Sequence, residues 1–302
     1  MSEIKLFKLS GKSASEVPGQ AVALEKSLQT LIEDNLDAFL GVRFVKAEHP
    51  TGKSHGGRID TLGIDENHCP VIIEYKRATN ENVINQGLFY LDWLLDHRAD
   101  FKLLVLERYN GDEADKIDWS GPRLICIAAD FTKYDQHAVQ QINRNIDLIR
   151  YRRFGDELLA LELVHSVTGA NEITADDESK PKAKPAEKTA SQVIAELAPS
   201  FSDLYEALRA FLLALGDDVT AMTTKYYVAF RRIKNFTSVV VRKSSLCVYL
   251  KLEPTADVLS GPNTRDVRKI GHWGTGDLEV IIQNMADFER AKPLLQRAYA
   301  AS

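Results

Sequence analysis

Cysteine is scarce and long apolar runs are absent in this chain of 302 residues. The three cysteines, Cys69, Cys126 and Cys247, are scattered and form no Cys-x-x-Cys pair, so a thiolate metal site or a disulfide framework is not indicated. They fit small buried side chains in a reducing compartment. No apolar run is long enough to span a bilayer, and residues 1–5 carry no apolar signal core. We therefore expect a cytoplasmic protein with no membrane partner.

An excess of positive charge is also lacking, since the formal net charge is −5. Enzymes that act on DNA often confine their cations to one cleft, so this balance lowers the expectation of a nucleic-acid partner without removing it. The sequence has no internal repeat, no G-x-S-x-G motif and no cluster among its seven histidines. Its length allows one or two domains.

The most informative stretch is a pair of β-branched apolar segments that carry charged residues. Residues 58–64 and 71–75 have the composition of strands, and the turn formers at 65–70 between them predict a β-hairpin. Strand side chains alternate between faces, so Glu74 and Lys76 point the same way. If Asp60 faces them across the hairpin, two carboxylates and an ammonium group converge. Carboxylate oxygens suit Mg²⁺, and a lysine beside the ion can orient or activate water.

The same three charges have a structural alternative. Asp60, Glu74 and Lys76 can instead form an ion-pair network at a sheet edge. Burying two carboxylates beside one lysine is unfavourable without a further cation, which favours the metal site.

Two predicted helices flank the hairpin in the sequence. Residues 21–40 place Leu24, Leu28 and Ile32 at helical spacing, and Gly41 ends this helix. Glu25 lies at the border of the apolar stripe, where it is either a partner of the helix dipole or a residue directed into a site. Residues 80–98 form a second helix, and its Gln86 follows the hairpin closely enough to lie over the same site.

The remaining segments up to residue 167 complete a mixed sheet. Residues 1–20 predict an extended arm or an added strand, and residues 42–48 a first strand. The continuous apolar runs 101–107 and 123–129 are typical of strands buried on both faces. Residues 132–144 are helical, and 146–154 and 158–164 form a hairpin that turns at Gly155-Asp156. This hairpin carries a basic strip of Arg150, Arg152 and Arg153. The strip either contacts phosphate or consists of solvated cations on an edge strand.

A stretch that imitates a nucleotide-binding loop precedes the central hairpin. Thr51-Gly52-Lys53-Ser54 matches the end of a P-loop, but Ala47 replaces the first glycine of that motif, and a strand is expected to follow in place of a helix. A nucleotide site is therefore rejected. Lys53 remains a candidate for phosphate contact, although a flexible surface loop is the simpler interpretation.

A change of composition marks a domain boundary. Residues 168–191 have almost no large apolar side chains, which predicts a flexible charged linker between a domain of residues 1–167 and a small α+β domain of residues 192–302. The second domain should contain a helix that ends at Gly216, strands at 224–230, 237–241, 246–252 and 278–282, and a final helix at 285–299. Residues 263–276 are expected either to bind a ligand, by cradling an anion or stacking on a base, or to serve a structural role. The candidates there are Arg265, Arg268, His272 and Trp273.

In their order along the chain, Glu25, Gly57-Arg58-Ile59-Asp60, Glu74-Tyr75-Lys76 and Gln86 resemble the PD-(D/E)XK nuclease superfamily, above all its RecB-like and NucS-like branches. The resemblance covers about residues 20–165. It implies a restriction-endonuclease-like fold of the α/β class, with a mixed sheet flanked by helices. Ile59 stands where the name-giving motif has proline, a position that varies widely in the superfamily.

The resemblance also implies roles for these residues. Asp60 and Glu74 would bind the divalent metal with help from the backbone carbonyl of Tyr75, and Glu25 would complete the metal shell, often through water. Lys76 would position the attacking water and offset charge on the phosphorane. The last member of the set, Gln86, would orient the site or touch the substrate backbone.

The activity implied is that of a Mg²⁺-dependent endo- or exodeoxyribonuclease, with Mn²⁺ as a substitute, in repair or in defence against foreign DNA. DNA is the expected partner, and Arg58 and Arg77 join the cationic candidates. Many nucleases of this fold dimerise to cut both strands, so a homodimer is compatible with the resemblance. The alternative is a nucleic-acid-binding or regulatory module that keeps the fold without cutting. The complete set of acidic and lysine positions argues against that alternative.

The C-terminal part resembles a second, uncharacterised domain. Residues 264–278 are similar to a domain at the end of various prokaryotic nuclease-like proteins, sometimes labelled a predicted transport protein. This resemblance implies no settled activity. We expect the C-terminal domain to recognise substrate or to mediate assembly.

Overall fold

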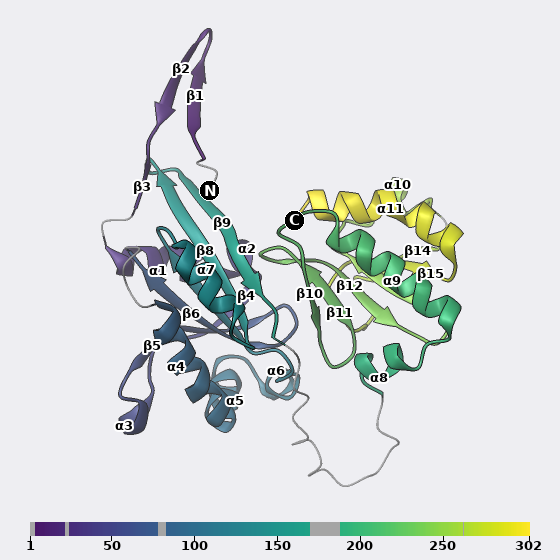
Figure 1. Ribbon diagram of the computed structural model, residues 1–302, viewed down its shortest axis with the longest axis horizontal. Coiled ribbons are helices and arrows are strands. Elements are labelled where there is room, and N and C mark those ends of the chain that lie inside the picture. Colours follow the sequence, from purple (N-terminus) through teal and green to yellow (C-terminus); the bar gives the residue numbers. More distant parts are fainter. Residues whose placement is uncertain (1–3, 22–23, 78–82, 170–187, 262) are drawn as a thin grey trace. The chain divides into compact units, whose positions relative to one another are not determined.

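The computed structural model describes residues 4–21, 24–77, 83–169, 188–261 and 263–302. The chain divides into two compact units. The first consists of residues 1–64, 70–115 and 122–167, and the second of residues 65–69, 116–121 and 168–302. Figure 1 shows that each unit has its own sheet and helices. Most of the predicted linker, residues 170–187, lies outside the described residues.

A seven-stranded mixed sheet forms the centre of the first unit. Its strands are β3 (Gly19–Gln20), β4 (Val42–Pro50), β5 (Arg58–Asp65), β6 (Pro70–Lys76), β7 (Arg123–Ala128), β8 (Asn145–Phe154) and β9 (Leu158–Val167). The order is β3-β8-β7-β6-β5-β4, and β9 also pairs with β8. Strand β7 is parallel to β6 and β8, whereas β5 and β9 are antiparallel to β6 and β8. Every residue of β7 is buried, as expected for a central strand covered on both faces.

Helices flank this sheet, so the predicted fold class is confirmed. They are α1 (Glu25–Glu33), α2 (Leu36–Leu40), α3 (Gly52–His55), α4 (Val83–Asp96), α5 (Arg98–Arg108), α6 (Gly111–Asp115) and α7 (Lys133–Gln140). Helix α4 packs on β6 and β7, where Gly87 approaches Leu124 so closely that a Cβ would clash. Helix α1 packs on β6. Strands β1 (Leu6–Ser10) and β2 (Ser13–Val17) form a two-stranded sheet of their own, in agreement with an extended arm.

The second unit combines helices with an antiparallel sheet, as expected for the α+β class. Its six antiparallel strands follow the order β10-β11-β12-β13-β15-β14. They are β10 (Thr220–Thr223), β11 (Val228–Arg231), β12 (Asn235–Val241), β13 (Leu246–Leu250), β14 (Thr264–Asp266) and β15 (Leu278–Ile282). The helices are α8 (Ala190–Ala195), α9 (Pro199–Leu213), α10 (Ala256–Leu259) and α11 (Met285–Ala300). Leu208 of α9, Leu295 of α11 and Val248 of β13 belong to one apolar core, so these helices cover one face of the sheet. Strand alternation puts Tyr249 on the other face, in a smaller cluster with Val267.

Residues 101–107 contradict their predicted strand, because they lie in helix α5. Phe101 and Val105, four residues apart, are buried, whereas Leu103 and Leu106 are 55% and 47% exposed. Burial therefore follows the helical period, which the continuous apolar run conceals in the sequence.

The single helix predicted over residues 21–40 is also wrong, because the structure has α1 and α2 in its place. Asn35 leaves the helical region, with φ at −131°, and its side-chain amide donates to the carbonyl oxygen of Leu31. Asparagine side chains compete with backbone hydrogen bonds in this way, which explains the break. Leu24, predicted on the apolar face, is an exposed N-cap residue, whereas Gly41 ends α2 in the left-handed conformation as predicted. Residues 22–23 lie outside the described part of the chain.

Other predicted elements differ in their bounds. The strand predicted at 224–230 begins later, at Val228 in β11, and a further strand, β10, ends before it at Thr223. Residues 52–55 form one helical turn, α3, where a flexible loop was the simpler expectation. The described part of the second predicted helix begins at Val83, and residues 78–82 of that region are not described. All three cysteines are free and buried, as predicted. Across the described ranges, no helix combines the length and apolar character needed to cross a membrane.

Candidate active site

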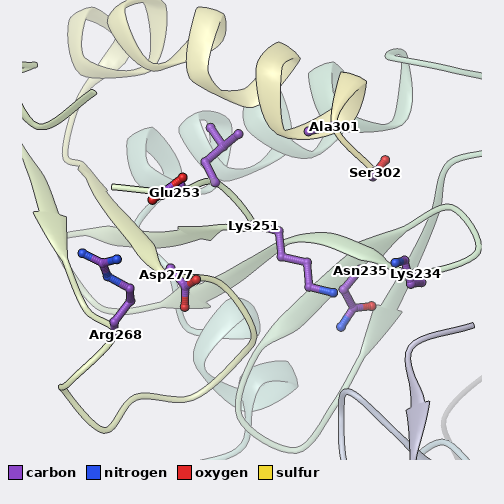
Figure 2. Close-up of a pocket in the computed structure, with 9 residues that line it drawn as sticks. Lys234, Asn235, Lys251, Glu253, Arg268, Asp277, Ala301 and Ser302 are labelled. Carbon is purple, nitrogen blue, oxygen red and sulfur yellow. The ribbon is translucent and has the colours of Figure 1, made fainter. Parts of the chain in front are cut away.

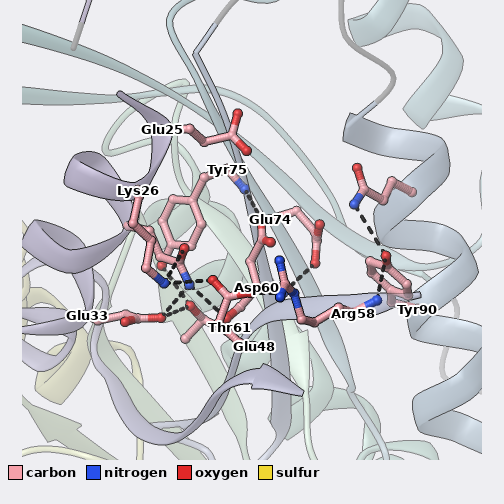
Figure 3. A network of polar contacts seen from close by, with 12 residues as sticks. Glu25, Lys26, Glu33, Glu48, Arg58, Asp60, Thr61, Glu74, Tyr75 and Tyr90 are labelled. Carbon is pink, nitrogen blue, oxygen red and sulfur yellow. Dashed lines mark hydrogen bonds and ion pairs between the residues drawn. The ribbon is translucent and has the colours of Figure 1, made fainter. Parts of the chain in front are cut away.

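Strands β5 and β6 pair in the predicted antiparallel hairpin, with Thr61 opposite Ile73. Just beyond this pair, side chains replace the backbone ladder. The backbone N–H of Asp60 donates to Glu74 Oε1, and the backbone N–H of Tyr75 donates to Asp60 Oδ2, each at 3.1 Å (Figure 3). Each carboxylate is therefore oriented by the opposite strand. Because β5 and β6 have neighbours on both sides, the hairpin lies inside the sheet and not at an edge.

The two carboxyl groups lie in a poorly solvated environment. Glu74 is fully buried and Asp60 is half-buried. Burial raises the pKa of Glu74 to about 9, and the nearby Asp60 carboxylate acts in the same direction. Burial likewise raises the pKa of Asp60, although the hydrogen bond from Tyr75 opposes this. Two adjacent carboxyl groups resist simultaneous ionisation. Without a bound metal ion, this pair therefore keeps a proton at neutral pH.

One oxygen of the pair lacks a hydrogen-bond partner. Glu74 Oε2 is buried and accepts no hydrogen bond. Buried polar atoms are nearly always paired, so such an oxygen indicates a place where a ligand supplies the missing interaction. Mg²⁺ fits this donor set, because proteins usually hold it with one or two carboxylates and leave other positions to water and substrate phosphates.

The resemblance implies two direct carboxylate ligands, Asp60 and Glu74, with Glu25 reaching the metal through water. Among the described residues, no group of three or more His, Cys, Asp or Glu side chains is arranged to hold a metal ion. Asp60 and Glu74 are the two carboxylates that the hairpin holds next to each other. Glu25 contacts Lys76 instead, and the carbonyl of Tyr75 remains a predicted ligand.

Lys76 and Glu25 form an ion pair beside the two carboxylates. Lys76 ends β6, Glu25 begins α1, and Nζ lies 3.2 Å from Oε1. The second oxygen of Glu25 accepts a hydrogen bond from the backbone N–H of Arg77 at 3.3 Å. Burial lowers the pKa of Lys76, but the carboxylates of Glu25, Asp60 and Glu74 outweigh that effect and raise it. Lys76 is therefore an ammonium group at neutral pH, suited to stabilising negative charge and not to accepting a proton.

Gln86 reaches the start of β5 through Tyr90. Its Nε2 donates to the Tyr90 hydroxyl at 3.4 Å, and the same hydroxyl accepts from the backbone N–H of Arg58 at 3.1 Å (Figure 3). Gly57 packs against this ring so closely that a Cβ would lie 2.6 Å from it. Helix α4 thus fixes the chain two residues before Asp60. Tyr90 follows Gln86 by one helical turn and was not predicted to take part in the site.

A polar network behind Asp60 was not predicted. The buried Gln29 donates from Nε2 to the backbone oxygen of Asp60 at 3.0 Å and to Glu33 Oε1 at 2.9 Å. Glu33 Oε1 also accepts from Thr61 Oγ1 at 2.6 Å. These bonds fix β5 relative to α1. A signal for them exists in the sequence, because Glu25, Gln29 and Glu33 recur every four residues and form one polar stripe along the helix.

Glu48 of β4 was also missed. Its backbone is left-handed, with φ at 53°, which is uncommon for a residue other than glycine. The carboxylate accepts a hydrogen bond from Lys26 Nζ at 2.7 Å and pairs with Arg58 Nε at 2.6 Å. The bond from Lys26 is the main reason that the pKa of Glu48 is lowered. Glu48 is thus ionised and holds Arg58, but no sequence pattern announces this backbone conformation.

The basic strip of the β8–β9 hairpin is corrected at Arg150. This side chain is buried, and it bonds to Asp130 at 3.0 Å and to Glu162 at 2.6 Å. It therefore links β8 to its neighbours and is not a surface cation. Arg153 pairs with Asp156, and Arg152 is half-buried.

The other predicted nucleic-acid contacts lie in both units. Lys53 and Arg77 are exposed in the first unit. In the second unit, Arg265 pairs with Glu279 at 2.7 Å, and Arg268 pairs with Asp266 at 2.6 Å. His272 and Trp273 lie in the loop that precedes β15.

A hollow of about 540 Å³ lies in the second unit (Figure 2). Side chains of both charges line it, so it has no strong bias toward one sign. The lining residues are Lys234, Asn235, Lys251, Leu252, Glu253, Arg268, Asp277, Ala301 and Ser302.

Comparison with known proteins gives one family match and one full-length relative. Residues 190–302 match the model of a family described as "Domain of unknown function (DUF5655)". An uncharacterized protein of Haemophilus influenzae is 29% identical over 303 residues, which cover 98% of this chain and 99% of that protein. Neither description states an activity.

Similar solved structures include a repair endonuclease from Pyrococcus abyssi, with 19% identity and a TM-score of 0.30, and EndoMS in apo form, with 19% identity and a TM-score of 0.28. Each match covers 43% of this chain and 47% of the other, so the chain spans about half the length of these structures. Similarity at this level carries no argument about function.

Proposed function

We propose that this protein is a nuclease that hydrolyses phosphodiester bonds of DNA with Mg²⁺, or Mn²⁺ in its place. One observation carries the proposal. Asp60 and Glu74 form a carboxylate pair in which the buried Glu74 Oε2 has no hydrogen-bond partner, and Lys76 follows two residues after Glu74 on the same strand. Such a pair suits a hard divalent cation, and the ammonium group suits an anionic substrate.

Asp60 and Glu74 would hold the metal, with the Tyr75 carbonyl and a water on Glu25 as further ligands. When bound, Mg²⁺ polarises a phosphoryl oxygen and eases the ionisation of water near neutral pH. Lys76 is charged, so it offsets the negative charge that develops on the phosphoryl oxygens and orients the attacking water. Glu25 keeps the Lys76 side chain in place through their ion pair.

The surrounding side chains keep the carboxylates in register. Gln29 holds the backbone of Asp60 from α1, and Tyr90 holds Arg58 from α4. Geometry fixed by such contacts matters because a small displacement of a reacting group lowers the rate strongly. Gln86 therefore acts on the site through Tyr90.

Cations close to the hairpin support a nucleic-acid substrate. Lys53 precedes β5, Arg58 begins it, and Arg77 follows Lys76. Lysine and arginine at such positions suit the phosphate backbone. The negative net charge of the chain agrees with a local patch of cations and not with a basic surface all round.

The experiment is a cleavage assay with the full chain. Single-stranded, double-stranded and branched DNA, and RNA, are incubated in Mg²⁺, Mn²⁺ or EDTA. We expect cleavage of DNA that requires a metal and falls at least about 100-fold in Asp60→Asn and in Lys76→Met. Asp37→Asn and Lys102→Met are matched controls, because they change the same residue types at exposed helix positions.

Three outcomes contradict the proposal in different ways. If no substrate is cut with any metal, the chain is not a nuclease, and DNA binding unaffected by EDTA would then favour a non-cutting module. If the site variants cut as fast as their controls, the active site lies elsewhere. If RNA alone is cut, the metal site stands but the substrate is wrong.

A further inference from the structure

Trp273 presents an aromatic ring to solvent in the second unit. Its side chain is 48% exposed, and its ring lies on Tyr226 with the ring centroids 4.1 Å apart and a tilt of 30°. Lys225 Nζ lies 5.3 Å from the centroid of the Tyr226 ring. A tryptophan ring that is half in solvent has an apolar face open to a flat ligand.

The residues on either side of Trp273 are anchored to the sheet. His272 stacks on Tyr249 of β13, with the ring centroids 4.2 Å apart and the planes within 7°. On the other side, the backbone N–H of Thr275 donates to Ser238 Oγ of β12 at 3.1 Å. These contacts hold the loop from two strands while the indole between them stays exposed.

Two glycines allow the loop to lie this close. Gly274, with φ at 88°, lies where a Cβ would be 2.6 Å from Ser238 Cβ. Gly276, with φ at 139°, lies where a Cβ would be 2.7 Å from the backbone of Leu250. Only glycine satisfies both the conformation and the contact at these positions. The exposed ring is therefore fixed in place before any ligand arrives, which lowers the entropy lost on binding.

Positive charge lies at the base of the same loop. Arg268 and Lys269 are exposed just before it. The hollow in Figure 2 borders both ends of the loop, since Arg268 and Asp277 line it together with Lys234 and Lys251. Glu253 also lines this hollow and Arg268 pairs with Asp266, whereas Lys269 is exposed at the base of the loop. An exposed aromatic ring with cations at the base of its loop is complementary to a ligand that combines a flat base with an anionic phosphate.

We propose that residues 268–276 bind single-stranded nucleic acid, with one unpaired base stacked on Trp273 and adjacent phosphates near Arg268 and Lys269. A duplex keeps the faces of its bases inside its own stack, so a stacking surface selects an unpaired strand. This inference rests on the proposed function for the class of ligand, and it adds the form of nucleic acid that the second unit takes.

The test measures binding without cleavage. The full chain carrying Asp60→Asn is titrated against a labelled oligothymidine of about 16 nucleotides, the upper end of common site sizes, and fluorescence anisotropy reports the affinity. A second oligonucleotide of equal length has abasic sites at its central positions. The parent should bind the base-containing strand roughly 5- to 150-fold more tightly than the abasic one.

Variants then assign this difference to one side chain. Adding Trp273→Ala should abolish the preference for bases, and Trp273→Phe should keep part of it. Met285→Ala is the matched control, because Met285 is 50% exposed in the same unit but offers no ring. Unfolding midpoints show whether each variant is folded, and Trp273→Phe decides the result if the alanine variant is not.

The inference is overturned if the parent binds both oligonucleotides equally, or if Trp273→Ala keeps the preference of the control. The inference would also be overturned if this loop bound a protein in preference to the oligonucleotide. Its failure differs from that of the proposed function. A chain that cuts nothing but loses the preference for bases with Trp273→Ala keeps this inference alone, and a chain that cuts DNA without that preference keeps the proposed function alone.

Discussion

Binding of Mg²⁺ at neutral pH should release a proton from Glu74. Burial and the nearby Asp60 carboxylate raise the pKa of Glu74 to about 9, so the metal-free protein carries this proton at pH 7. A carboxyl group must be ionised to act as a metal ligand, so the ion displaces the proton. We expect about one proton released for each ion bound at pH 7. The apparent affinity should rise about tenfold for each pH unit until the pH nears 9.

Isothermal titration calorimetry in buffers with different heats of ionisation measures this release. The observed heat should depend on the buffer at pH 7 with a slope close to one proton, and the slope should fall as the pH passes about 9. Glu74→Gln should bind Mg²⁺ weakly and release no proton, whereas the exposed control Asp37→Asn should behave as wild type. Binding of Mg²⁺ at pH 7 without proton release would refute the reasoning, because it would mean that the pair is already ionised.

The same proton makes the free energy of unfolding of the metal-free protein depend on pH. The pKa of Glu74 is raised from 4.5 to about 9 by folding, so between these values the native state holds a proton that the unfolded chain has lost. The free energy of unfolding should therefore decrease as the pH rises through this window, by up to about 1.4 kcal/mol per pH unit. Glu74→Gln resembles the protonated acid, so it should remove this slope and be more stable than wild type at pH 8. Urea melts from pH 5 to 9 test this, and a slope shared by both proteins would assign the proton elsewhere.

Two further substitutions test parts of the fold near the site. Arg150→Met leaves Asp130 and Glu162 without their buried partner. It should therefore lower the free energy of unfolding by about 2 kcal/mol in urea melts and leave the affinity for DNA unchanged. Weaker DNA binding at wild-type stability would instead show that Arg150 is a nucleic-acid contact. Gly57→Ala places a Cβ 2.6 Å from the Tyr90 ring, so it should cost about 1–3 kcal/mol by the same measurement. The added change Tyr90→Leu should recover part of that loss, and no recovery would show that the clash is not the cause.

The hairpin was predictable because its signals are local. Two β-branched runs joined by turn formers give β5 and β6, and strand alternation then places Glu74 and Lys76 together. The antiparallel register brings Asp60 beside Glu74, as predicted. Glu25 was expected to complete the metal shell, often through water, and the structure pairs its side chain with Lys76.

Features that depend on tertiary packing were not predictable. The run at 101–107 is mostly apolar, with Lys102 and Glu107 as its charged residues, so its burial pattern appears only once α5 has a neighbour on one side. Arg150 seemed a surface cation because its partners, Asp130 and Glu162, are distant in the sequence and meet it only in the folded sheet. The left-handed backbone of Glu48 has no sequence signature of its own.

The rate of DNA cleavage by wild type and by Glu74→Gln, side by side at pH 7 in Mg²⁺, tests the proposed metal site most directly. Glu74 is protonated in the metal-free protein at this pH, so the substitution preserves its charge and shape while it removes a metal ligand. The proposed site predicts metal-dependent cleavage by wild type and a rate at least about 100-fold lower for Glu74→Gln. Equal rates for the two proteins would contradict it.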